Sequence, residues 1–107
     1  MALPLTKNVF ERTLNTRFWL IDESGWHHAL DFMELENGCS TPTQEQFSLR
    51  FRGDAAYVFP QRIYPVQHDL IGDFDLFLVP IGRDQSGTTY EAVFNRLIQP
   101  SNLELSV

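Results

Sequence analysis

The chain has 107 residues, of which 43% are hydrophobic, a single cysteine and a formal net charge of −6. This length fits one domain, residues 1–107, with a core large enough to fold without a metal, and one cysteine excludes an internal disulfide. The acidic balance argues against general nucleic-acid binding, and no apolar run approaches the roughly 18 residues that a membrane-spanning helix needs.

The first third of the chain predicts a short helix followed by a β-hairpin. Residues 5–14 place apolar side chains at helical spacing after Thr6, a suitable N-cap. Residues 17–22 are rich in aromatic and branched side chains, which favours a strand, and 23–25 supply turn residues. Residues 26–36 are expected to form the return strand, with a β-bulge or two buried faces because their alternation is imperfect; a helix is the alternative.

The middle of the chain contains the clearest strand. Residues 37–45 hold Asn-Gly, a proline and several hydroxyl side chains, which are typical of a loop. Over residues 46–52 apolar and polar side chains alternate up to Gly53, as they do on a half-buried strand. The apolar set, which is predicted to face the core, is Phe47, Leu49 and Phe51; the polar set, which is predicted to face water, is Ser48, Arg50 and Arg52.

A second strand region follows this one. Residues 57–60 are expected to be extended but short, and 61–68 to form a strand with Tyr64, Val66 and His68 on one face. Pro65 has no N–H to donate to a neighbouring strand, so this strand is predicted to lie at an edge or to carry a bulge.

The C-terminal third predicts another hairpin. Residues 74–81 are the most apolar stretch and are expected to be buried on both faces. Residues 82–87 are predicted to form the hairpin loop, and 88–95 the return strand, with Tyr90, Ala92 and Phe94 on one side. The alternation at 103–107 predicts a last short strand or a free tail.

These elements together predict a mainly β domain. Six or seven strands joined by short turns, with one short N-terminal helix, indicate a small antiparallel barrel or sandwich. The turns are too short for parallel crossovers, which need about a dozen residues or more.

The sequence has no motif typical of catalysis, metal binding or cofactor binding. His27 and His28 are adjacent and would point to opposite faces of a strand, and Cys39 stands alone in a loop. Acids near the turn at residue 72 are ordinary turn formers, and no nucleophile elbow or phosphate-binding loop is present. We therefore expect no catalytic residue, no metal and no cofactor.

Two groups of side chains are candidates for recognition. Trp19 and Trp26 flank the first turn, and with Arg50 and Arg52 they form a candidate interaction surface, since exposed tryptophan is common at interfaces. The simpler interpretation is that the tryptophans cap the core and that the arginines pair with acids across strands. A second candidate is a ligand pocket at the mouth of a barrel, lined by Tyr64, His68 and Tyr90.

Several segments, in this order, resemble one known family. They are FSLRFRGD (47–54), YPVQH (64–68), LIGD (70–73), LFLVPIG (76–82) and YEAVFN (90–95). The resemblance is to a family of small bacterial β-rich proteins classed only as a domain of unknown function, and it spans most of the chain. It implies no activity, cofactor or catalytic residue; the setting that it implies is that of accessory proteins of phage-tail-like systems.

The leading hypothesis is a non-enzymatic accessory module that binds another protein. It would bind by strand addition at an edge or through an aromatic patch, and an exposed edge would also let two copies pair. The alternatives are a small-ligand-binding β-barrel, and an acidic inhibitor or immunity-type protein that covers a basic site. The N-terminus lacks the basic and apolar regions of a signal peptide, so a cytoplasmic location is expected.

Overall fold

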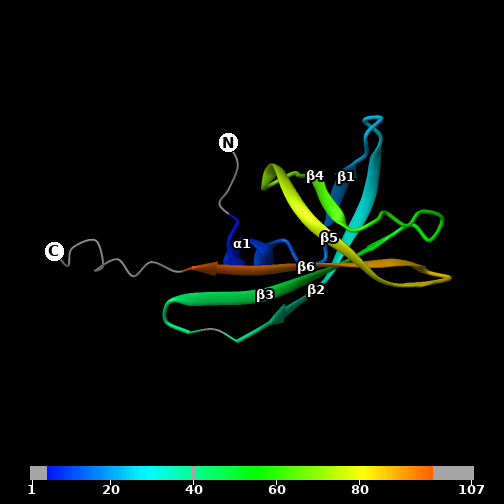
Figure 1. Cartoon of the computed structure of the whole chain (residues 1–107). Helices are drawn as coiled ribbons and strands as arrows, with labels where there is room; N and C mark the ends of the chain where they lie inside the picture. The colour runs from blue at the N-terminus through cyan, green and yellow to red at the C-terminus, as the bar shows by residue number, and fades with distance from the viewer. Residues whose placement is uncertain (1–4, 40, 98–107) are drawn as a thin grey trace.

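A computed structural model describes residues 5–39 and 41–97. They form a single closed sheet with one short helix at its end. The strands run in the order β1-β2-β3-β6-β5-β4, every neighbouring pair is antiparallel, and β4 pairs back to β1 (Figure 1). The predicted mainly β fold is confirmed, and it is a barrel rather than a sandwich. The elements are α1 (Lys7–Arg12), β1 (Arg17–Ile21), β2 (His27–Asn37), β3 (Gln44–Gly53), β4 (Arg62–His68), β5 (Gly72–Asp84) and β6 (Gly87–Leu97).

Phenylalanine rings fill the barrel. The alternation in β3 buries Phe47, Leu49 and Phe51, as the sequence predicts, because successive side chains on a strand point to opposite faces. Tyr90 and Ala92 are buried on β6, the strand that pairs with β3. Ring contacts such as Phe18–Phe51, with centroids 5.2 Å apart, connect strands that are distant in sequence.

Helix α1 closes one end of the barrel. Thr6 caps it by accepting a hydrogen bond from the Val9 amide at 3.3 Å, and the six-residue helix is shorter than the predicted span of 5–14. Phe10 is fully buried beneath the helix, which lies over the β3–β6 ribbon (Figure 1). Five aromatic rings surround Phe10: Phe18, Phe32, Phe47, Phe74 and Phe94.

Residues 26–36 belong to a strand and not to a helix. The register of β2 against β3 shifts between Phe32 and Glu34, which is the bulge that the broken alternation predicts. Leu30 and Phe32 face the core before the shift, whereas Met33 is exposed.

The prediction that residues 74–81 are buried on both faces is wrong. Leu76 and Leu78 point into the barrel, but Phe77 and Ile81 are about half exposed. The physical reason is the architecture: a small barrel has one inner face, and among the described residues no layer covers the outer face of β5.

The hairpin loop between β5 and β6 is also shorter than predicted. Instead of residues 82–87, only Gln85 and Ser86 separate the two strands. The Asp84 carboxylate accepts hydrogen bonds from the amides of Ser86 and Gly87, which stabilises this tight turn. Gly87 has φ +154° and packs so closely that an added Cβ would lie 2.5 Å from the Gly53 carbonyl oxygen.

Strand β4 is not an edge strand. It pairs with β5 from Arg62 to His68, and with β1 through Trp19↔Gln67 and Leu20↔Val66. The next pair of the β1–β4 ladder would join Ile21 to Pro65, and Pro65 has no N–H to donate. The proline therefore ends the ladder at a short seam, and no described strand is a free edge.

Residues 57–60 lie outside the sheet, and 38–43 connect β2 to β3, with residue 40 outside the described part. The predicted strand or free tail at 103–107 also lies outside the described residues.

Candidate functional site

A hollow of about 550 Å³ opens at the end of the barrel away from α1. It lies between the start of β2, the segment 54–61 and the tip of the β5–β6 hairpin; the last two lie on the right of Figure 1, and β2 starts at the top. Its wall combines aromatic rings with polar heads, which is the usual composition of a recognition site. The side chains that matter below are His28, Arg52, Tyr57, Phe59, Ser86 and Tyr90.

His28 lines this hollow and contacts two of its aromatic rings. Its Nε2 lies 2.8 Å from the Asp22 carboxylate, and its ring meets Tyr57 and Phe59 edge-on, with centroids 5.1 and 4.8 Å away. Asp22 also accepts hydrogen bonds from the Ser24 and Trp26 amides, so one carboxylate shapes the β1–β2 turn and orients the imidazole. The hydrogen bond from His28 lowers the pKa of Asp22, which keeps this carboxylate ionised.

Trp26 does not line this hollow but lines the one next to it. It is 71% exposed and Tyr57 is 50% exposed, and together with His28 they line an adjoining hollow of about 410 Å³. Trp26 therefore does not cap the core, which is the simpler interpretation given above. Trp19 is half-buried on the outer side of β1, under the Arg17 guanidinium at 5.9 Å, and lines a different hollow.

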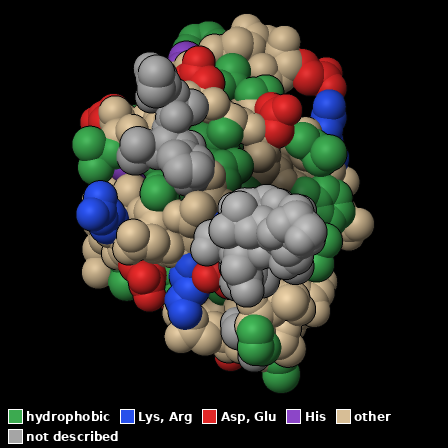
Figure 2. Space-filling view, turned by 90° about the vertical axis from the view of Figure 1, so that its left-hand side faces the viewer, with side chains coloured by type: hydrophobic (Ala, Val, Ile, Leu, Met, Phe, Trp, Pro, Cys, Tyr) green, Lys and Arg blue, Asp and Glu red, His purple; other side chains and the backbone are tan. Residues whose placement is uncertain are grey.

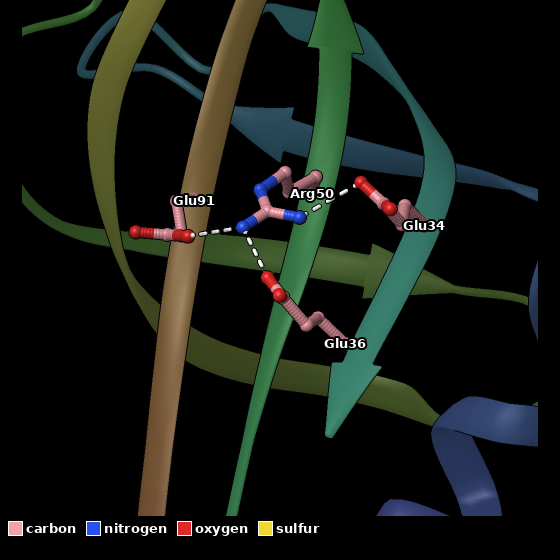
Figure 3. Close-up of polar contacts among 4 residues, drawn as sticks. All are labelled: Glu34, Glu36, Arg50 and Glu91. Atoms are coloured by element: carbon pink, nitrogen blue, oxygen red, sulfur yellow. Dashed lines mark hydrogen bonds and ion pairs between the residues drawn. The ribbon is translucent and has the colours of Figure 1, made fainter. Parts of the chain in front are cut away.

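Arg50 and Arg52 share one face of β3 but have different environments. Arg50 pairs with Glu34 at 2.8 Å, Glu36 at 2.5 Å and Glu91 at 3.2 Å (Figure 3). Hydrogen bonds to Glu36 and Glu34 raise the pKa of Arg50 above its ordinary value. Arg52 lies at the hollow and donates to the Ser86 hydroxyl.

The expectation of cross-strand ion pairing therefore fits Arg50 and not Arg52. Among the described residues, no ion pair within 4.0 Å involves Arg52. Since the Ser86 contact uses one terminal nitrogen, the guanidinium keeps donors that a ligand can reach.

The three residues predicted to line a barrel mouth are buried and border three different hollows. The Tyr64 hydroxyl donates to the Pro60 carbonyl, and the Tyr90 hydroxyl accepts from the Phe59 amide at 2.9 Å. Tyr90 borders the large hollow, Tyr64 borders a neighbouring hollow of about 410 Å³, and His68 borders a third. Tyr64 and Tyr90 both pack against Phe59, with ring centroids 5.8 and 6.4 Å away, whereas His68 packs against Phe18. The structure therefore does not bring Tyr64, His68 and Tyr90 together at one opening.

His68 connects two loops through hydrogen bonds at both of its ring nitrogens. Its Nδ1 accepts hydrogen bonds from the Leu70 and Ile71 amides at 3.0 and 3.4 Å, and its Nε2 lies 2.8 Å from the Thr16 hydroxyl. An accepting Nδ1 requires the neutral ring with the proton on Nε2. Burial lowers the pKa of His68, which favours the same neutral form.

The sequence did not point to Tyr57, Phe59 or Ser86 as site residues. Tyr57 and Phe59 lie in a segment without regular structure, and Ser86 reaches Arg52 only through the short hairpin. One feature of the sequence does indicate this site. Asp22 precedes His28 by six residues across a predicted turn, and this spacing brings their side chains together on neighbouring hairpin strands.

Within the described residues, no group of three or more His, Cys, Asp or Glu side chains is placed to hold a metal ion. The helix found in that part of the chain is neither long nor apolar enough to cross a membrane. On the side of the molecule seen in Figure 2, acidic and basic side chains of the described residues alternate with hydrophobic ones, and neither charge forms a large patch.

Comparison with known proteins identifies the family of this chain. No curated protein and no solved structure matches the chain. One family model, Domain of unknown function (DUF6916), matches residues 5–94, a stretch that runs from α1 into β6 and contains the whole His28 hollow. The chain therefore belongs to the DUF6916 family, a domain of unknown function.

Proposed function

We propose that this protein is a non-enzymatic interaction module that holds another protein at the His28 hollow. The observation that carries the proposal is a pair of exposed aromatic side chains: Tyr57 lines this hollow and the adjoining one, and Trp26 lines the adjoining one. Large aromatic side chains are costly to leave in water, and tryptophan, tyrosine and arginine are the residues that most often dominate binding energy. All three types occur across the two adjoining hollows, since Arg52 and Tyr57 line the larger one and Trp26 and Tyr57 line the smaller one.

The aromatic groups are held in place before any partner arrives. The Trp26 amide donates to Asp22 at 3.0 Å, which fixes the turn that presents the indole. Tyr57 stacks on Phe59 with ring centroids 6.1 Å apart, and the Phe59 amide is bonded to Tyr90. A site that is already ordered loses less conformational entropy on binding, which favours affinity.

A module of this kind would serve as an accessory protein in the cytoplasm. The phage-tail-like setting implied by the family resemblance is the first place to seek its partner. A small-ligand barrel has less support, because aromatic packing occupies the barrel interior where such a ligand would sit.

The test uses the full chain as an affinity bait in its source organism, followed by binding measurements with the purified partner. We expect Trp26→Ala and Tyr57→Ala each to weaken binding by about tenfold or more, since they remove the exposed anchors. Leu70→Ala is the matched control, because Leu70 is equally exposed but lies outside the hollow. Unchanged affinity in both aromatic variants, with folding confirmed by circular dichroism, would show that the hollow is the wrong surface.

A further inference from the structure

Although every strand of the barrel has two neighbours, β6 is longer than the ladder that joins it to β5. That ladder ends at Val79↔Glu91, whereas β3 pairs with β6 as far as Leu97. Beyond this point β5 turns away toward β4, and β6 continues alongside β3 (Figure 1). Among the described residues, nothing pairs with the backbone of residues 92–97 on the side away from β3. We call this stretch the open edge of β6.

The position of Pro80 shows which way the backbone groups of β6 point. In an antiparallel ladder, pairs that exchange both N–H···O=C bonds alternate with pairs that exchange none. Proline has no N–H, so Pro80↔Tyr90 is a pair without hydrogen bonds and the neighbouring Val79↔Glu91 is a bonded pair. Glu91 therefore directs its N–H and C=O groups toward β5 and away from β3.

The same alternation continues along the open edge. The ladder between β3 and β6 has no register shift, so every second residue of β6 points its backbone groups the same way. The groups of Val93, Asn95 and Leu97 therefore point away from β3, as those of Glu91 do. Unlike Glu91, these three residues have no strand opposite them in the part of the chain that the structure describes.

The open edge is accessible to water. Helix α1 packs on the inner face of the ribbon, where Phe10 contacts Phe47 and Phe94. Because side chains alternate along a strand, Val93 and Leu97 lie on the outer face, and they are 67% and 77% exposed. Exposed apolar side chains beside unpaired backbone groups favour the addition of another strand.

The ribbon of β2, β3 and β6 has a second unpaired edge, which is protected by charge. Within the described ranges, residues 33–37 of β2 pair with β3 but with no strand on their other side. The Glu34 and Glu36 side chains on this stretch are 60% and 58% exposed. Charged side chains on an edge strand oppose pairing with another chain, so the β2 edge is disfavoured as an interface.

The open edge of β6 lacks this protection. Residues 92–97 include no acidic side chain, although the whole chain has a net charge of −6. Their one charged side chain is Arg96, which pairs with Glu45 of β3 at 2.9 Å. The two edges of one ribbon thus differ, and only the β6 edge combines apolar side chains with a lack of acids.

We propose that the open edge of β6 pairs with the same edge of a second copy of this chain. Antiparallel pairing about a two-fold axis at Asn95 places Val93 opposite Leu97 of the second copy, and Leu97 opposite Val93 of the second copy. The two Asn95 residues face each other. Each of these pairs exchanges two backbone hydrogen bonds, and the two ribbons join into one continuous sheet.

Self-complementarity selects a second copy as the occupant. Val93 and Leu97 lie symmetrically about Asn95, so one two-fold operation matches apolar with apolar side chains at both ends and amide with amide in the middle. The exposed glutamates of β2 stay at the far edges of the joined ribbons. Burial of Val93 and Leu97 offsets part of the repulsion between two chains of net charge −6.

Sedimentation of the full chain in an analytical ultracentrifuge tests the pairing, over about 5 to 500 µM because dimer formation depends on protomer concentration. We expect a monomer–dimer equilibrium. Raising the salt from about 20 to about 200 mM should strengthen the dimer, because salt screens the repulsion between two acidic chains. A chain that stays monomeric throughout, or a dimer that salt dissociates, would overturn the proposal.

Asn95→Asp tests the two-fold axis. Aspartate keeps an oxygen to accept the hydrogen bond that Gln44 donates at 2.7 Å, but it places two carboxylates opposite each other in the dimer. We expect the dimer to weaken about tenfold or more. Asn37→Asp is the matched control, because it makes the same change at an exposed position on the β2 edge, and it should change dimer affinity less than about twofold. Equal losses in the two variants would exclude the open edge of β6.

Asn95→Pro tests the backbone hydrogen bonds without adding charge. Proline removes an N–H that points away from β3, so the ladder between β3 and β6 keeps its hydrogen bonds and circular dichroism should show an intact fold. We expect the dimer to be lost. A dimer of unchanged affinity in this variant would show that the Asn95 backbone takes no part in it.

A mixture of two variants tests the register. Val93→Lys and Leu97→Glu should each weaken self-association, because each buries a charge against an apolar side chain. When the two proteins are mixed, the introduced lysine and glutamate lie opposite each other at one end of the heterodimer. We expect the mixture to associate more strongly than either variant alone. A mixture no stronger than its components would rule out this register.

The rival occupant is the tail of the same chain, since residues 98–107 follow β6 directly and lie outside the described residues. Leu103→Pro with Leu105→Pro removes N–H groups that a tail strand would need, and it should leave the dimer unchanged. A chain that dimerises only with these prolines would identify its own tail as the occupant and overturn the proposal. None of residues 92–97 lines the His28 hollow or the adjoining one, so failure here leaves that site standing.

Discussion

At the scale of single residues, one buried histidine makes the stability of the fold depend on pH. His68 accepts two backbone hydrogen bonds at Nδ1, which only the neutral ring can do, and it lies on the Phe18 ring with centroids 4.3 Å apart. Burial lowers the pKa of His68, with a smaller opposing effect from Asp69. Folding therefore favours the neutral imidazole, and protonation works against the native state.

The direction of this pH effect follows from comparing the lowered pKa of His68 in the folded protein with that of a histidine in the unfolded chain, about 6.5. Above that pH the stabilising contribution is complete. As the pH falls below it, the unfolded chain takes up the proton first, and the contribution is lost progressively toward the lower pKa of the folded state. We expect the free energy of unfolding, measured in urea, to fall between about pH 7.5 and 5.5.

A comparison of variants isolates that contribution. His68→Gln should be less stable at pH 7.5 and should show a flatter dependence on pH, whereas His27→Gln, at an exposed position, should keep the wild-type slope. Equal slopes in all three proteins would mean that His68 does not titrate as the geometry implies.

At the scale of elements, α1 is too short to be stable alone and depends on one side chain. Isolated helices of fewer than about 12 residues are marginal in water. Phe10 anchors this six-residue helix among five other rings, each with its centroid within 6.5 Å. The helix therefore exists because tertiary packing pulls Phe10 into the open end of the barrel.

Removing this anchor should be costly. Phe10→Ala is expected to lower the free energy of unfolding by about 3–5 kcal/mol, the usual range for a fully buried phenylalanine. Leu14→Ala, just after the helix and partly exposed, should cost less than about 1 kcal/mol. Chemical denaturation measures both free energies of unfolding. Similar small losses in the two variants would show that Phe10 does not anchor the helix.

At the scale of the whole molecule, the barrel is unevenly closed. β3 and β6 pair over ten residues each, whereas β1 and β4 join through two residue pairs. Local opening follows the weakest set of hydrogen bonds, so the seam should open more often than the β3–β6 ribbon. Two of the hollows that border the seam include Ile21 and Pro65, the residues at which its ladder stops.

Amide hydrogen exchange in the native state tests this uneven closure. We expect the Trp19 and Gln67 amides to exchange faster than those of Leu49 and Ala92, which lie opposite each other in the long ribbon. The ribbon amides should exchange only through global unfolding. Uniform protection across all four positions would show that the seam is as stable as the rest of the sheet.

Much of the local structure follows from residue order. The alternation of Phe47, Leu49 and Phe51 with polar neighbours identifies the inner face of β3, and the broken pattern in 26–36 identifies a bulge. Thr6 marks the start of the helix. These features depend on pleat and helix geometry within a few residues, so the local order of residues is sufficient to specify them.

The barrel closure and both candidate surfaces depend on tertiary structure. Nothing near Arg50 and Arg52 in the sequence separates them, yet one lies among three glutamates and the other beside Ser86, because β2 and β6 flank β3 at a particular register. Strand order likewise exposes Phe77 and gathers His28 with Tyr57. The sequence by itself determined which side of each strand is apolar, since that is a property of neighbouring residues. Only the tertiary structure decided which side chains meet, since that depends on contacts between strands distant along the chain.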